Sequence, residues 1–271
     1  MTAMPGPVMK GPALSFALVD DYAFSCAPAN SRQPLSFEPA ALGPQIEFAL
    51  LAAQGAVPAI QSGLDTVYMR AIGDGPPNRL VALGDHAGTL KLSADPMVGT
   101  EWTRLSLHTK RAAVVAGFAD RIAAQLSAAI GELASNIYEH SQAPETGIVA
   151  YRGTHGLFEF VVADSGVGAL ATLRTNPNLK DLATDREALP MVLQEGCSRF
   201  LDPLRGNGFK DLFRGLANHE GSLRFRSGEA AVLIDGQSPS PLRPKVKPKV
   251  RLNGFMASVN CRVAMATPAH G

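Results

Sequence analysis

The most regular pattern of apolar and polar positions lies in the alanine-rich stretch from about residue 100 to residue 141, which predicts helix. Apolar side chains recur there three or four positions apart, at Leu126, Ile130, Leu133 and Ile137. They should form one buried stripe of the helix. A polar stripe lies about 110° around the same helix. It contains Glu132, Asn136, Glu139 and His140.

Two runs with strand character follow this helix, at 147–152 and 157–163. The turn-forming segment Gly153-Thr154-His155-Gly156 separates them, so the two runs predict a β-hairpin. The second strand should end at Asp164, which is followed directly by Ser165-Gly166-Val167-Gly168. A carboxylate is therefore expected at a strand end, inside a glycine-containing turn.

The sequence after this turn is polar and interrupted by prolines from 169 to 205, which predicts a long mobile insertion with a short helix at 186–196. Gly206-Asn207-Gly208 should then open a helix that runs to about residue 219. Further strands are expected at 223–226, 230–234 and 254–262.

The first hundred residues mix short apolar runs with turn signals and contain one good helical candidate, at 46–54. The sequence changes near residue 100, where the alanine-rich helical pattern begins. We therefore expect a smaller N-terminal α/β region of unassigned role at 1–100 and a second domain at 101–271. The apolar stretch 48–60 is shorter than the ~20 apolar residues that a membrane span requires.

Composition places the chain among ordinary globular proteins, since 46% of its 271 residues are hydrophobic. A formal net charge of +1 argues against nucleic acid or a membrane surface as an obligate partner. The basic strip 243–251 lacks interleaved aromatic residues and is expected to be a solvated loop. The three cysteines are widely spaced without a C-x-x-C pair, which favours a reducing compartment. The cytoplasm is the expected location.

Candidate chemistry begins with Glu132 and Asn136, which lie four residues apart and should be stacked neighbours on one helix. The carboxylate could serve as a base for water and the amide oxygen as a ligand for Mg²⁺. Asp164 could accept a hydrogen bond from an exocyclic amine such as that of adenine. Taken alone, the Glu132–Asn136 pair is more typical of a solvated helix face, and Asp164 is as typical of an ordinary Asp-x-Gly turn.

The Gly206-x-Gly208 segment could present backbone N–H groups and the positive end of a helix to phosphate oxygens. Three basic side chains lie close to it in sequence and could neutralise phosphate charge: Arg199, Arg205 and Lys210. Basic residues near a loop are also common as solvated side chains.

The order of these features resembles the GHKL (histidine-kinase-like) ATPase superfamily, which includes histidine kinases, anti-sigma serine kinases, topoisomerase ATPase subunits and Hsp90. Residues 132–140 are similar to its N box, 164–168 to its G1 box and 206–213 to its G2 box. The resemblance covers roughly residues 105–263. It implies an α/β (α+β) two-layer sandwich in which a mixed β-sheet of the Bergerat type is backed by helices.

The resemblance also implies roles for single residues in binding ATP and Mg²⁺. Asn136 would hold the Mg²⁺ that bridges the phosphates, and Asp164 would bind the adenine amine. Gly166 and Gly168 would shape the pocket. The phosphate-side loop would consist of Gly206, Asn207 and Gly208, and residues 169–205 would form the ATP lid.

Glu132 is the expected catalytic residue, because in this family it polarises the attacking nucleophile. The resemblance implies a role in bacterial-type signalling or regulation, and three activities stay open. The chain could hydrolyse ATP, it could transfer the γ-phosphate to a serine or threonine of a partner, or it could be a nucleotide-gated binding module with little catalysis. A regulatory protein partner is expected in each case, and a homodimer is compatible with all three.

Overall fold

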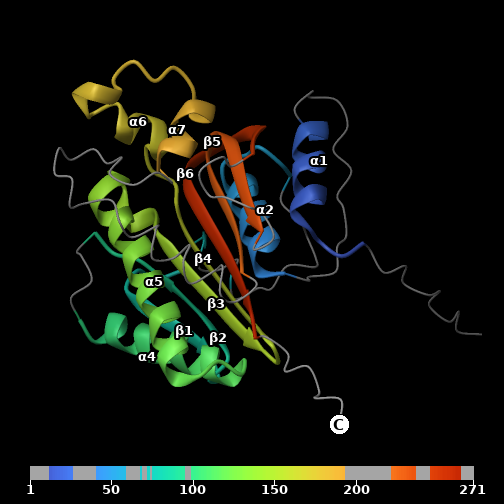
Figure 1. Cartoon of the computed structure of the whole chain (residues 1–271), viewed down its shortest axis with the longest axis vertical. Helices are drawn as coiled ribbons and strands as arrows, with labels where there is room; N and C mark the ends of the chain where they lie inside the picture. The colour runs from blue at the N-terminus through green and yellow to red at the C-terminus, as the bar shows by residue number, and fades with distance from the viewer. Residues whose placement is uncertain are drawn as a thin grey trace, which may run out of the picture.

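The fold is an antiparallel β-sheet that carries helices on both faces (Figure 1). The computed structural model describes residues 12–26, 41–58, 68, 72–73, 75–94, 99–192, 221–235 and 245–263. Among these residues, none of the helices combines the length and the apolar character needed to cross a membrane.

The sheet has six strands in the order β1-β2-β3-β4-β6-β5, and every neighbouring pair is antiparallel. The strands are β1 (Arg79–Leu83), β2 (Ala87–Lys91), β3 (Ile148–Thr154), β4 (Leu157–Asp164), β5 (Ser222–Asp235) and β6 (Val246–Arg262). The hairpin predicted from the sequence is confirmed as β3–β4. The predicted mixed sheet was wrong, because no described pair of strands is parallel.

Three predicted strand boundaries also change. The runs predicted at 223–226 and 230–234 are one strand, β5, with register shifts on either side of Gly228. β6 begins well before the predicted residue 254 and includes residues 246–251 of the basic strip. The solvated loop expected there was therefore wrong for these six positions, because their backbone pairs with β5 or continues the strand.

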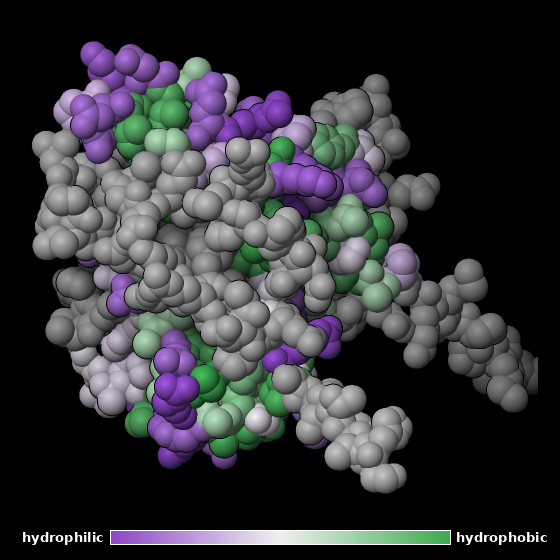
Figure 2. Space-filling view, viewed as in Figure 1, coloured by the Kyte–Doolittle hydropathy of each residue, from purple (hydrophilic) through white to green (hydrophobic). Residues whose placement is uncertain are grey.

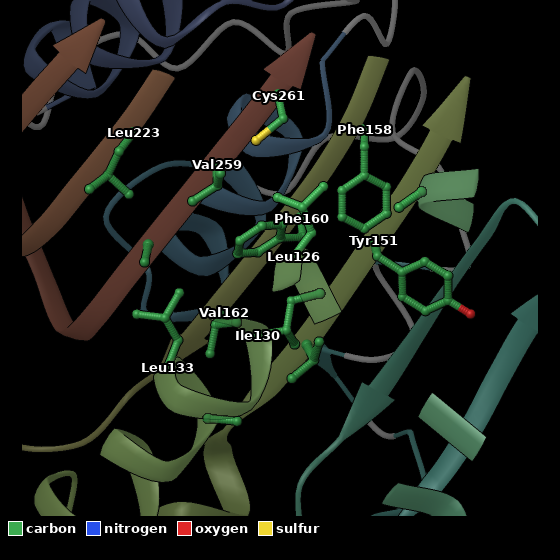
Figure 3. Close-up of a cluster of buried hydrophobic side chains, with 14 of the residues drawn as sticks. Leu126, Ile130, Leu133, Tyr151, Phe158, Phe160, Val162, Leu223, Val259 and Cys261 are labelled. Atoms are coloured by element: carbon green, nitrogen blue, oxygen red, sulfur yellow. The ribbon is translucent and has the colours of Figure 1, made fainter. Parts of the chain in front are cut away.

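One face of the sheet packs against α4 (Thr100–Val115) and α5 (Asp120–His140), which replace the single helical stretch predicted to residue 141. The predicted apolar stripe of α5 is buried at all four positions. Leu126, Ile130 and Leu133 point at the side chains of β3 and β4 that face them (Figure 3). The sheet residues of this core include Tyr151, Phe158, Phe160 and Val162.

The opposite face packs against α1 (Phe16–Cys26) and α2 (Leu42–Ala53). Ile148, Ala150, Val161 and Ala163 alternate with the residues of the first core and line this second one. The predicted α+β sandwich is confirmed, but it has three layers in place of the predicted two. The sheet also runs across the boundary expected near residue 100, because β2 pairs directly with β3.

A buried ionic cluster fastens the second helix layer to the sheet. Arg224 of β5 donates from Nε to Oε2 of Glu47 at 2.7 Å and from Nη2 to Oδ1 of Asp20 at 2.7 Å. Arg226 pairs with the same Glu47, and Lys249 pairs with Asp20. α1, α2, β5 and β6 each contribute at least one charge, so these two helices are held by polar as well as apolar contacts.

Candidate functional site

The polar stripe of α5 lies where the sequence predicted it, beside the buried stripe. Leu133 and Ile137 are buried against the sheet, which fixes the rotation of the helix about its axis. Glu132 is consequently exposed and Asn136 is half-buried. The two side chains are one turn apart along the helix, as expected from their spacing.

Asp164 is the last residue of β4 and is only 1% exposed. It follows Val162 at the strand period of two, so its side chain belongs to the face covered by α5. Its Oδ1 accepts a hydrogen bond from the backbone N–H of Gly166 at 2.6 Å. One oxygen of the carboxylate is thus held by the turn that follows the strand.

The second carboxylate oxygen of Asp164, Oδ2, has no such partner: it is buried, and no described residue donates a hydrogen bond to it. Burial raises the pKa of this carboxyl to about 7, although the backbone N–H groups of Gly166 and Phe255 pull it in the other direction. A buried acceptor without a donor is destabilising and uncommon in folded proteins. A ligand that reached Oδ2 with a donor of its own would supply the missing hydrogen bond.

The turn after Asp164 requires glycine for reasons of space. A Cβ atom at Gly166 would lie 2.1 Å from the carbonyl oxygen of Ser141. Gly168 has a φ of +78°, and a Cβ there would lie 2.8 Å from the hydroxyl of Ser227. Both glycines of the D-x-G-x-G pattern thus allow neighbouring groups of the protein to approach the turn closely.

The same turn is tied to the C-terminal end of α5. The N–H of Val167 donates to the carbonyl of Ser141 at 2.9 Å. The hydroxyl of Thr172, in α6 (Gly168–Leu173), donates to the carbonyl of His140 at 3.1 Å. These bonds bring the last turns of α5, which carry Asn136, beside the turn that holds Asp164.

The segment predicted as a long mobile insertion is folded in its first part. α6, the short 3₁₀ helix η2 (Pro177–Leu179) and α7 (Asp185–Val192) form one helical unit, whose outer surface is largely hydrophilic around an apolar patch (Figure 2). Leu189 of α7 enters the core, and the N–H of Glu229 donates to Oδ2 of Asp185 at 3.0 Å. Residues 169–192 are therefore folded as helices, and α7 is anchored on β5. The helix predicted from residue 186 is confirmed over the described part.

The rest of the predicted phosphate side lies outside the described residues. This applies to Arg199, Arg205, Gly206, Asn207, Gly208 and Lys210. In the described ranges no group of three His, Cys, Asp or Glu side chains could hold a metal ion. The predicted metal ligand, Asn136, is an amide and would share the ion with phosphate oxygens.

Sequence reasoning missed two residues beside Asp164. Ser227 of β5 is fully buried, and its hydroxyl donates to the carbonyl of Gly254 at 2.7 Å. A Cβ atom at Gly254 would lie 2.2 Å from the backbone oxygen of Asp164. The only sequence signal was a serine or asparagine next to a glycine at the edge of a predicted strand, at Ser227-Gly228 and Asn253-Gly254.

Comparison with known proteins adds no identification. No protein-family model matches the chain, and no curated protein and no solved structure matches it either.

Proposed function

We propose that this protein binds Mg-ATP in a site of the GHKL kind, with the adenine held by Asp164. One observation carries the proposal: the carboxylate of Asp164 is buried at a strand end with Oδ1 held by Gly166 and Oδ2 without a donor among the described residues. The exocyclic amine of adenine is a donor of suitable chemistry for Oδ2. Binding would supply the missing hydrogen bond to a group that has already lost its hydration.

The Mg²⁺ and phosphate part of the proposal rests on the position of α5. Asn136 lies one turn before His140, whose carbonyl is bonded to α6 near the start of the proposed lid. A neutral amide oxygen at this position suits Mg²⁺, which also takes ligands from phosphates. The phosphate-side loop at 206–208 and the basic residues Arg199, Arg205 and Lys210 complete the proposed site.

The proposed reaction depends on Glu132, which is exposed one helical turn before Asn136. A carboxylate there would accept a proton from water in an ATPase, or from a serine or threonine hydroxyl of a partner protein in a kinase. The exposure of Glu132 also fits a nucleotide-gated module that engages a regulatory partner and turns over little ATP. Replacement of Glu132 by Gln separates the two enzymatic activities from the binding module, because it should abolish hydrolysis or phosphate transfer in an enzyme and leave ATP binding intact in every case.

Thermal unfolding with nucleotides tests the binding proposal directly. ATP with Mg²⁺ should raise the melting temperature more than GTP or inosine triphosphate (ITP), whose base carries a carbonyl in place of the adenine amine. Asp164→Asn should remove or invert the preference for ATP over ITP, because the amide NH₂ can donate to that carbonyl.

The matched control is Asp21→Asn, which changes an exposed aspartate of α1. Equal stabilisation of the wild type by all three nucleotides would contradict adenine recognition.

A further inference from the structure

A row of three residues crosses the sheet at the proposed adenine site. Asp164 of β4 is paired with Phe255 of β6, and Phe255 is paired with Ser227 of β5. Each of the three lies two positions along its strand from a residue of the core under α5, namely Val162, Ala257 and Phe225 respectively. The row therefore lies on the face of the sheet that α5 and α6 cover.

A single peptide unit links the two ends of this row. The carbonyl of Gly254 accepts the hydrogen bond from the Ser227 hydroxyl. The N–H of Phe255 lies beside Asp164, since Phe255 is paired with Asp164 and a Cβ atom at Gly254 would lie 2.5 Å from Oδ1 of Asp164. The two groups belong to the same Gly254–Phe255 peptide, which is planar and rotates as one body. A hydrogen bond at its carbonyl end therefore fixes the direction of its N–H end.

The Ser227 hydroxyl also reaches the first turn of α6. The N–H of Ala169 donates to Oγ of Ser227 at 2.9 Å, while the hydroxyl proton goes to Gly254. Gly168 packs on the same oxygen, since a Cβ there would lie 2.8 Å from it. Ser227 is fully buried, so water cannot replace either partner without a rearrangement.

We propose that Ser227 is a positioning residue for base recognition: its hydroxyl orients the Gly254–Phe255 peptide against Asp164 and fastens that peptide to the first turn of α6. The inference rests on the proposed ATP site and adds a residue that touches no part of the nucleotide. It predicts that discrimination between ATP and ITP depends on the hydroxyl. The two nucleotides share ribose and triphosphate, so their affinity ratio reports the base contact alone.

The test is calorimetric titration of the full-length protein with Mg-ATP and Mg-ITP. Ser227→Ala should lower the ratio of ATP to ITP affinity about tenfold, as expected when a buried hydrogen bond is lost at the recognition group. Ser227→Cys keeps nearly the same side-chain volume but offers only a weak donor, so it should lower the affinity ratio in the same way. This variant tests the positioning role if the alanine variant does not fold. Ser227→Thr keeps the hydroxyl and should retain most of the discrimination.

Ser258→Ala is the matched control, because Ser258 is also a buried serine of the sheet but lies among residues that face α1 and α2. A general loss of stability would lower both affinities equally in either alanine variant. An unchanged ATP to ITP ratio in folded Ser227→Ala or Ser227→Cys would overturn the positioning role while the ATP site itself stands. Absence of ATP binding in the wild type would be a different result. It would overturn the proposed function and, with it, the positioning role of Ser227.

Discussion

At the residue scale, the carboxyl of Asp164 is energetically unfavourable to bury, and one of its oxygens has no hydrogen-bond donor among the described residues. Its carboxyl is almost completely buried, one oxygen is held by the turn, and the pKa is raised to about 7 chiefly by desolvation. Groups with such strong perturbation are concentrated at functional sites, because a purely structural role would be better served by a neutral residue. The pH dependence of folding makes this cost measurable.

We predict that the folded state loses stability as the pH rises from about 4 to about 7. The unfolded carboxyl ionises near its ordinary pKa, whereas the folded one keeps its proton up to about 7, so the folded state binds more protons in this window. The contribution to the free energy of unfolding is at most about 4 kcal/mol. Urea unfolding of the wild type and Asp164→Asn at several pH values checks it. The wild type should lose stability relative to the variant as the pH rises; a constant difference would contradict the raised pKa.

At the element scale, the site depends on the contact between the end of α5 and the turn that follows β4. The N–H of Val167 and the hydroxyl of Thr172 bond to the last carbonyls of this helix, and Gly166 lies directly against the carbonyl of Ser141. No side chain fits between the two elements at Gly166. The contact therefore fixes the position of α5, which carries Asn136, relative to Asp164.

Gly166→Ala should separate these two elements and abolish nucleotide binding. The added Cβ would lie 2.1 Å from a backbone oxygen, which neither element can accommodate without shifting. Gly131→Ala is the control on the same helix, since its Cβ would meet only Trp102, at 3.7 Å. That variant should gain about 0.5–1 kcal/mol, because alanine is favoured over glycine within a helix. Thermal unfolding with and without Mg-ATP compares the two, and retained ATP binding in Gly166→Ala would contradict the prediction.

At the scale of the whole molecule, the N-terminal helices are part of one sandwich with the rest of the chain. α1 and α2 cover the face of the sheet that α4 and α5 leave open, and they carry Asp20 and Glu47 to the guanidinium groups of β5. Burial of charge is tolerated only when each group is paired and hydrogen-bonded. The cluster thus ties α1 and α2 to the sheet, and its loss should destabilise the fold.

Glu47→Ala should consequently destabilise the fold by about 3–5 kcal/mol, because it leaves both Arg224 and Arg226 buried without their shared carboxylate. Glu145→Ala, at an exposed glutamate, should change stability by less than about 0.5 kcal/mol. Chemical denaturation of both variants measures the difference. Equal stability of the two would mean that the cluster contributes nothing to holding the helix layer.

Local patterns in the sequence were sufficient to predict α5, with its buried and polar stripes, and the β3–β4 hairpin that ends at Asp164. Hydrophobic periodicity and turn-forming residues depend only on residues close together in the chain, so both can be recognised in a single sequence. The second helix layer and the ionic cluster could not be predicted in this way, since they join residues as far apart in the sequence as Asp20 and Arg224. Only the tertiary structure decided that Oδ2 of Asp164 has no donor among the described residues, and that Ser227 reaches the same site through one peptide. Burial and hydrogen-bond partners depend on which distant strands lie side by side, and no local pattern records that.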